Sequence, residues 1–279
     1  MNPRFLAALA ILVATPASAQ LLEGGARSIA LGRAGVALGD DVWAEANPAA
    51  WATLAGRRAE AFASQAFGLT ELRTAAVAAA MPSGLAGFAV VLRTYGFADY
   101  RENRLSVGAA RAVRLDAARR LTVGMRLDYH ATATVGFESA ATGDLSLGVQ
   151  TELAPALRAG LAARNVVGMA RADSSDLRAP LSSGPAVLAG VAYRPSARSL
   201  LLLAVDKDLD YPIVARAGVE FAPVDALALR LGASAAARGV PARLSFGAGV
   251  RVGAAAADVA VEWHETLGPS TAIGVGLRF

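Results

Sequence analysis

The chain ends on the stretch TAIGVGLRF, residues 271–279, and this stretch decides the fold. Apolar side chains stand at every second position, at Ile273, Val275, Leu277 and Phe279, with small or charged residues between them. A period of two residues is that of a β-strand, whose successive side chains point to opposite faces. The last segment therefore predicts a strand with one apolar face and one face of glycine and arginine.

The same alternation recurs upstream, in runs separated by turn residues. It is clear in 121–130, 145–152, 157–164, 187–194, 213–221, 227–234, 244–252 and 259–263. Weaker strands are predicted over 58–67, 71–81, 85–95 and 104–114, and over 198–206, where Leu200 to Leu203 break the alternation. With the closing stretch, the sequence predicts about fourteen strands.

The predicted connections alternate in length along the chain. Short turns fall at one end, at 82–84, 115–119, 153–156, 194–197 and 222–225. Longer loops fall at the other end, at 96–103, 131–143 and 168–184. An even number of antiparallel strands with short turns on one side and long loops on the other is typical of an outer-membrane barrel. We therefore expect an all-β fold, a transmembrane antiparallel β-barrel.

The composition agrees with strands that cross a membrane. The 279 residues are 54% hydrophobic and only 18% charged, yet after residue 20 no apolar run approaches the roughly 20 residues of a membrane helix. The apolar residues are interleaved with small or polar ones instead.

The N-terminus reads as an export signal. Arg4 gives a positive start, residues 5–14 form a short apolar core, and Ala17-Ser18-Ala19 is an A-x-A cleavage site. We expect cleavage after Ala19 and a location in the bacterial outer membrane. The chain has no cysteine, which excludes disulfides, thiolate metal sites and a lipid anchor on cysteine.

Aromatic residues indicate which face meets lipid. On alternating strands, Tyr193, Phe221 and Phe279 fall at one end of the barrel, and Tyr129 and Trp263 fall at the other. All of them share the apolar parity. Two belts of outward aromatic rings that flank an apolar band are what a bilayer with two interfaces requires.

Charged residues occupy the opposite parity. A charge that faces lipid near the bilayer midplane costs roughly 2–4 kcal/mol, so we expect the strand arginines to point into the lumen. Inward carboxylates can pair with them, because unpaired buried charges are destabilising. The predicted luminal charge network consists of Arg126, Asp128, Glu152, Arg158, Arg164, Arg216, Glu220, Arg230, Arg251, Glu262 and Arg278.

Residues 20–57 do not alternate and are rich in small side chains. A barrel of eight strands is filled by its own side chains, whereas fourteen strands leave a lumen that something must fill. We expect 1–19 to be a signal peptide, 20–57 a luminal plug and 58–279 the barrel. The acids Asp40, Asp41 and Glu45 are placed to meet inward arginines.

The stretch ARSIALGRAGVALGDDVWAEANPAAWA, residues 26–52, resembles the N-terminal signature of the PorV/PorQ outer-membrane proteins, relatives of the FadL fatty-acid channel. The resemblance is carried by an LGxAGVA-type stretch, a following Asp and then Asn-Pro-Ala. The matching positions include Leu31, Gly32, Gly35, Asp40, Asp41, Asn47, Pro48 and Ala49. It implies a non-enzymatic barrel that serves protein secretion or surface attachment, with secretion-system components or a secreted cargo as partners. The terminal Phe279 resembles the signature that barrel-assembly machinery reads.

Other chemistry finds little support in the sequence. A nucleophile needs a base and an orienting group, and the two histidines, His130 and His264, lie at predicted strand ends without metal-ligand spacing. Gly32-Arg33-Ala34-Gly35 lacks the spacing of a phosphate loop. The net charge of +4 comes from arginines spread singly along the chain, which argues against nucleic acid. We expect no catalytic residues, metal or cofactor, and outer-membrane lipid as the solvent.

Two alternatives to the secretion role stay open. The first is a FadL-like channel for hydrophobic small molecules, with a movable plug. The second is a structural barrel without transport. The inward arginines and carboxylates then form either a selectivity lining or a structural network inside a plugged barrel.

Overall fold

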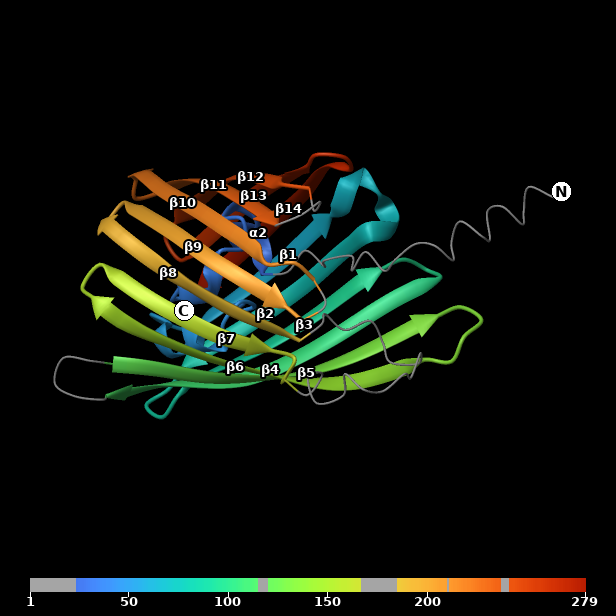
Figure 1. The fold of residues 1–279 in the computed structure, drawn as a ribbon, viewed down its shortest axis with the longest axis horizontal. Helices are drawn as coiled ribbons and strands as arrows, with labels where there is room; N and C mark the ends of the chain where they lie inside the picture. The colour runs from blue at the N-terminus through green and yellow to red at the C-terminus, as the bar shows by residue number, and fades with distance from the viewer. Residues whose placement is uncertain (1–23, 115–119, 167–184, 210, 237–240) are drawn as a thin grey trace.

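Fourteen antiparallel strands close into one barrel in the structure, a computed structural model that describes residues 24–114, 120–166, 185–209, 211–236 and 241–279. Each strand pairs with its neighbours in sequence, and β1 (Arg58–Gln65) pairs with β14 (Gly268–Arg278) to close the cylinder (Figure 1). The predicted all-β barrel of about fourteen strands is therefore confirmed. The predicted signal peptide lies outside the described residues.

The remaining strands follow in chain order around the wall. They are β2 (Arg73–Pro82), β3 (Gly87–Gly96), β4 (Tyr100–Arg114), β5 (Arg120–Thr134), β6 (Ala140–Ala154), β7 (Leu157–Arg164), β8 (Ala186–Ser196), β9 (Ser199–Asp208), β10 (Val214–Val224), β11 (Leu227–Ala236), β12 (Arg243–Val252) and β13 (Ala255–His264). We call the end at which β1 starts and β14 finishes the lower end, and the opposite end the upper end.

Two of the predicted long upper loops are wrong in extent. The ladder between β4 and β5 runs up to the pair Tyr100 and Thr134, and β6 begins at Ala140. Only 97–99 and 135–139 connect these strands at the upper end. The sequence hides the extensions because above the apolar band the strands carry small or polar residues without large apolar ones on one face, so the alternation fades while pairing continues. The third predicted loop, 168–184, lies outside the described residues.

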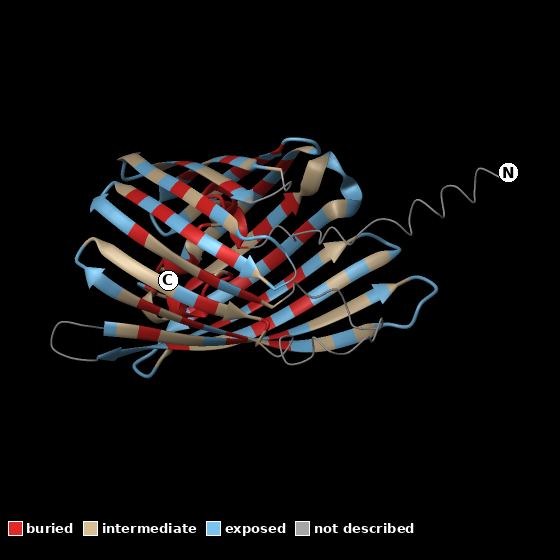
Figure 2. Cartoon of the chain, viewed as in Figure 1, coloured by how far each residue is buried: buried red, intermediate tan, exposed pale blue. Residues whose placement is uncertain are grey.

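Burial alternates along the strands as the period of two requires (Figure 2). In β2, for example, Ala76, Ala78 and Ala80 are buried whereas Val77 and Met81 are exposed. The exposed side chains on the outer wall are mostly apolar, an arrangement that is unfavourable in water and normal against lipid.

The broken alternation of β9 has a physical cause. Leu200 and Leu202 point into the barrel and are buried, while Leu201 and Leu203 are exposed outside. The inward leucines belong to a buried apolar cluster with Leu31 of the N-terminal segment. This strand is apolar on both faces because it meets an apolar surface on each side.

The N-terminal segment before β1 lies inside the cylinder, where Figure 1 shows it in blue. It forms the short helix α2 (Gly25–Ala30) and the 3-10 helices η1 (Gly35–Ala37) and η2 (Pro48–Thr53). Further 3-10 turns, η3 (Ala66–Gly68) and η4 (Thr70–Leu72), connect β1 to β2. Within the described residues, no helix has both the length and the apolar character needed to cross a membrane.

Candidate functional site

The filled lumen is the candidate functional site. We call residues 24–57 the luminal segment. Its apolar side chains, among them Ile29, Leu31, Val36 and Trp51, are almost wholly buried against the barrel wall. Helix α2 packs on strands β12, β13 and β14, and η2 packs on β4, β5 and β6. The segment therefore touches opposite sides of the cylinder at once.

Glycines on the inner wall make room for the luminal segment. An added Cβ at Gly160 would lie 2.2 Å from the carbonyl oxygen of Val36, and one at Gly232 would lie 2.1 Å from the backbone nitrogen of Gly32. Both distances are far inside van der Waals contact. We call these positions the glycine slots, and they comprise Gly108, Gly124, Gly148, Gly160, Gly190, Gly218, Gly232 and Gly247.

Asn47 fastens the middle of the segment. Its Oδ1 accepts a hydrogen bond from the Ala49 N–H at 3.0 Å, which caps η2, and Pro48 occupies the first helical position as such caps favour. Its Nδ2 donates to the carbonyl oxygens of Val36 at 2.8 Å and Val149 at 3.0 Å. The side chain thus joins two turns of the segment to strand β6.

Glu45 is the centre of a buried ion cluster in the upper half of the lumen. Its carboxylate accepts from Arg93 Nη2 at 2.6 Å, from Arg104 Nη2 at 2.5 Å and from Arg126 Nη1 at 3.2 Å. Burial alone would raise the pKa of Glu45, but the attraction of the three guanidiniums outweighs it and holds that pKa well below its usual range. Asp128 completes the cluster by accepting from Arg126 Nε at 2.9 Å.

Near the upper end, one further ion pair joins the luminal segment to the wall, and another joins two strands of the wall beside it. Arg33 of the segment pairs with Glu262 on β13, which also accepts from Arg243 Nη1 at 3.3 Å. Arg216 on β10 donates through Nε to Asp206 on β9 at 2.7 Å.

A second layer of charges lies toward the lower end. Arg27 in α2 makes a bidentate pair with Glu220 at 2.7 and 2.8 Å, and Arg230 donates to the same carboxylate at 2.6 Å. Arg230 also reaches Asp258 at 2.5 Å. Asp40 pairs with Arg58 at the foot of β1. The lumen is therefore apolar and glycine-lined in the middle and charged above and below.

Beneath this lower layer the lumen opens into a polar cavity of about 340 Å³. Guanidiniums and carboxylates line it in equal measure, and Asp41 and Glu60 are among them. Glu60 accepts a hydrogen bond from Trp43 Nε1 at 2.7 Å. This cavity is the lower mouth of the filled barrel.

The residues of the motif in 26–52 come together in the structure. Leu31 is buried, Gly32 has a φ of 62° in its slot against Gly232, and Pro48 and Ala49 lie against Gly124. A Cβ at Gly35, in contrast, would have no atom closer than 3.8 Å. Asp41 accepts from the N–H groups of Trp43 and Ala44, which makes it a turn residue.

The predicted charge network divides into two sets. The first takes part in the buried clusters and consists of Arg126, Asp128, Arg216, Glu220, Arg230 and Glu262. The second lies at strand ends. There Glu152, with its side chain 60% exposed, pairs with Arg158 at 3.2 Å, and Arg278 lies 3.6 Å from Asp40. Arg251 lines the lower cavity, and Arg164 ends β7 at the upper side.

The predicted interface aromatics all lie on the outer wall. Tyr129 and Trp263 are exposed at the upper ends of their strands. Tyr193, Phe221 and Phe279 are exposed at the lower ends.

Both histidines contact neighbouring groups at the upper end of the barrel. His130 Nε2 lies 3.5 Å from Asp144, and His264 Nδ1 accepts from the backbone N–H groups of Thr266 and Leu267 at 3.2 Å. Over the described ranges, no group of three or more metal-ligating side chains gathers at one point.

Sequence reasoning missed Arg93 and Arg104 as partners of Glu45, and Arg27 and Arg33 as the cations of the segment itself. Arg93 and Arg104 stand on the inward parity of β3 and β4, where the alternation is weak. Their positions in the two-residue period predict that both arginines point inward. Nothing in the sequence predicts that they meet Glu45 across the lumen.

The fold is shared with solved structures of a hydrocarbon channel, a toluene transporter and a FadL homologue. It matches the monoaromatic hydrocarbon channel CymD with a TM-score of 0.66 at 11% identity, over 93% of this chain and 98% of that chain. It matches the P. putida toluene transporter TodX with a TM-score of 0.65 at 11% identity, over 93% and 99%. A Pseudomonas aeruginosa FadL homologue matches with a TM-score of 0.56 at 10% identity, over 91% and 98%.

No family model matches the sequence, and no curated protein matches it. At identities this low, the likeness establishes the fold alone.

Proposed function

We propose that the protein is an outer-membrane channel of the FadL type that admits small hydrophobic molecules, with the luminal segment as its movable plug. One observation carries the proposal: a closed fourteen-strand barrel holds its own N-terminal segment, in a fold shared over nine-tenths of both chains with a monoaromatic hydrocarbon channel. The function is transport, not catalysis.

The upper loops support capture of apolar molecules. Phe137, 78% exposed, and Val135 stand at the tip of the β5–β6 hairpin, beyond the aromatic belt at Tyr129. Phe97 and Leu69 are also exposed in upper connections. Exposed apolar side chains that lie together in this way can mark a surface that binds apolar ligands.

In the resting state the plug is closed. The glycine slots and the Glu45 cluster leave the middle of the lumen filled, so passage requires that part of the luminal segment moves.

The proposal includes the route by which the protein reaches its membrane. The signal sequence is cleaved after Ala19, the closing strand that ends at Phe279 is read by barrel-assembly machinery, and the outer wall is solvated by outer-membrane lipid. The PorV/PorQ resemblance implies a secretion role instead. We place that role second, because the exposed apolar loops suit small hydrophobic molecules better than a folded cargo.

The decisive experiment locks the plug. A Cβ built on Gly274 of β14 lies 3.6 Å from Cβ of Ala26 in α2, within the range of about 3.5–4.5 Å that a disulfide spans. The variant Ala26→Cys/Gly274→Cys therefore ties plug to wall when oxidised. Gly35→Cys/Ala46→Cys, whose Cβ atoms lie 3.8 Å apart within the luminal segment, is the matched control.

Uptake of radiolabelled toluene and of a long-chain fatty acid is measured in intact cells with and without the gene. We expect uptake to depend on the gene, to fall on oxidation of the plug-to-wall pair, to recover on reduction, and to be unaffected by the control pair. Uptake that does not depend on the gene refutes the channel. Retention of a secreted protein in the periplasm of the deletion strain would establish the secretion role. If the deletion changes neither uptake nor secretion, a structural barrel without transport is the remaining interpretation.

A further inference from the structure

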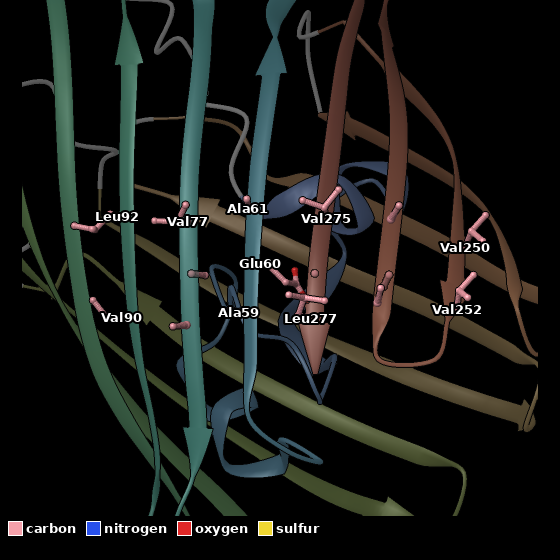
Figure 3. Close-up of a pocket in the computed structure, with 16 residues that line it drawn as sticks. Ala59, Glu60, Ala61, Val77, Val90, Leu92, Val250, Val252, Val275 and Leu277 are labelled. Carbon is pink, nitrogen blue, oxygen red and sulfur yellow. The ribbon is translucent and has the colours of Figure 1, made fainter. Parts of the chain in front are cut away.

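The outer wall is hollowed on one side of the barrel, over strands β12, β13, β14, β1, β2 and β3 (Figure 3). The hollow has a volume of about 720 Å³. Pockets of roughly 300–1,000 Å³ are the size that binds small ligands. The outside of a cylinder is convex, so a hollow of this size on it needs an explanation.

Two neighbouring rows of outward side chains line this groove. The strand register places Ala255, Leu277, Ala59, Ala79 and Val90 in one row. The next row contains Ala257, Val275, Ala61, Val77 and Leu92. The alanines of these rows, on β13, β1 and β2, have short side chains, so the outer wall is thinner there than at the flanking valines and leucines.

The groove is closed below by large side chains. One row lower stand Met81, Phe88 and Phe279, all of them exposed on the outer wall. Of the described residues that line the groove, only Glu60 is ionisable, and its carboxylate is held on the luminal side by Trp43. The groove is therefore apolar throughout its outer face and ends near the lower interface.

A positive charge stands at that lower end. Arg57 is exposed and continues the outward column of Ala59 and Ala61, and its carbonyl oxygen accepts from the Phe279 N–H. Among the described residues, no carboxylate forms an ion pair with Arg57. A guanidinium at the level of the lipid headgroups attracts phosphate.

We propose that this groove binds one glycerophospholipid of the periplasmic leaflet, with an acyl chain over Ala59 and Ala79 and its phosphate on Arg57. The leaflet follows from the short turns at the lower end, which in such barrels face the periplasm. A second copy of this chain fits poorly, because a two-fold interface sets the same surface against itself and two hollows leave a void.

The test is lipid retention by native mass spectrometry. The full-length mature protein is purified in detergent and titrated with palmitoyl-oleoyl phosphatidylglycerol or, separately, with lipid A. Ala79→Phe fills the groove with a side chain that remains compatible with lipid. Ala189→Phe on β8, six strands around the barrel from β2, is the matched control. Arg57→Gln removes the charge, and Arg111→Gln, exposed at the lower part of β4, is its control.

We expect the wild-type protein to retain one phosphatidylglycerol, and Ala79→Phe to lower its affinity at least tenfold. Arg57→Gln should weaken binding about fivefold, the factor that corresponds to the ~1 kcal/mol of one basic residue at a membrane surface. Both controls should bind as the wild type does. Equal retention by Ala79→Phe and wild type, preference for lipid A, or a dimer that Ala79→Phe dissociates would each overturn the proposal. If Ala79→Phe fails to fold, the Arg57→Gln comparison still decides.

Discussion

At the scale of the residue, Glu45 anchors the luminal segment, because three arginines of the wall share its one buried carboxylate. The acids of the luminal segment were expected to meet inward arginines, and parity placed Arg126 inside. The partners Arg93 and Arg104 lie 48 and 59 positions away along the chain. Which arginines meet one carboxylate depends on the path of the segment through the lumen, and no local pattern encodes that path.

Replacing Glu45 should destabilise the protein strongly. Glu45→Gln leaves three buried guanidiniums without their shared carboxylate, and breaking a buried pair costs about 3–5 kcal/mol. Glu152→Gln removes an exposed pair with Arg158 and should cost at most about 1 kcal/mol. Urea unfolding in detergent micelles measures both. Equal stability of Glu45→Gln and wild type would contradict the cluster as the anchor of the segment.

Asp41 gives a pH dependence of known sign. Burial raises the pKa of Asp41 to about 6, although Arg27 and the N–H groups of Trp43 and Ala44 oppose the rise. Between the unfolded value of about 4 and this folded value, the native state binds more protons than the unfolded state, so the free energy of unfolding falls as the pH rises.

The change Asp41→Asn removes this titration. From pH 4 to pH 6, we expect the free energy of unfolding of the wild type to fall relative to that of Asp41→Asn. Above pH 6 the difference between the two should stay constant. Unfolding curves at several pH values supply the comparison. A difference that stays constant from pH 4 to pH 7 would show that Asp41 titrates normally.

At the scale of the element, the strands were largely predictable and their inner contacts were not. Alternation located β5 to β8 and β10 to β14, because an apolar outer face and a small-residue lumen impose opposite side chains. The glycines near mid-strand are visible in the sequence, but the sequence does not identify which part of the luminal segment packs against each of them. Leu200 and Leu202 broke the pattern because they meet the luminal segment.

A methyl group in a glycine slot should displace the luminal segment. An added Cβ at Gly124 would lie 2.5 Å from the backbone nitrogen of Ala49 and 2.6 Å from the carbonyl oxygen of Pro48. Overpacking of this kind costs about 1–3 kcal/mol. Gly143→Ala on β6, whose Cβ would lie 3.8 Å from the nearest atom, is the control.

Thermal unfolding and planar-bilayer conductance measure the two glycine variants. We expect Gly124→Ala to unfold at a lower temperature and to conduct ions more often than wild type, and Gly143→Ala to match wild type in both. Identical behaviour of the two variants would mean that the slots do not hold the segment.

At the scale of the whole molecule, the outer wall, the middle of the lumen and the two ends of the lumen differ in chemical character. The outer band is apolar, the middle of the lumen is packed with alanine, leucine and tryptophan, and ion clusters lie above and below that packing. Closure and the outward face followed from the alternation of the strands. The division into two charge layers did not, because it depends on which residues of the luminal segment lie at which height.

The most direct test of the account measures side-chain environment along one strand. The protein has no cysteine, so single cysteines placed in turn at residues 243–251 of β12 can each carry one spin label. In lipid vesicles, collision with oxygen reports exposure to acyl chains. We predict high oxygen accessibility at Leu244, Phe246, Ala248 and Val250, and low accessibility at the intervening positions. Accessibility without a two-residue period, or a period of opposite phase, would contradict a barrel whose apolar face meets lipid.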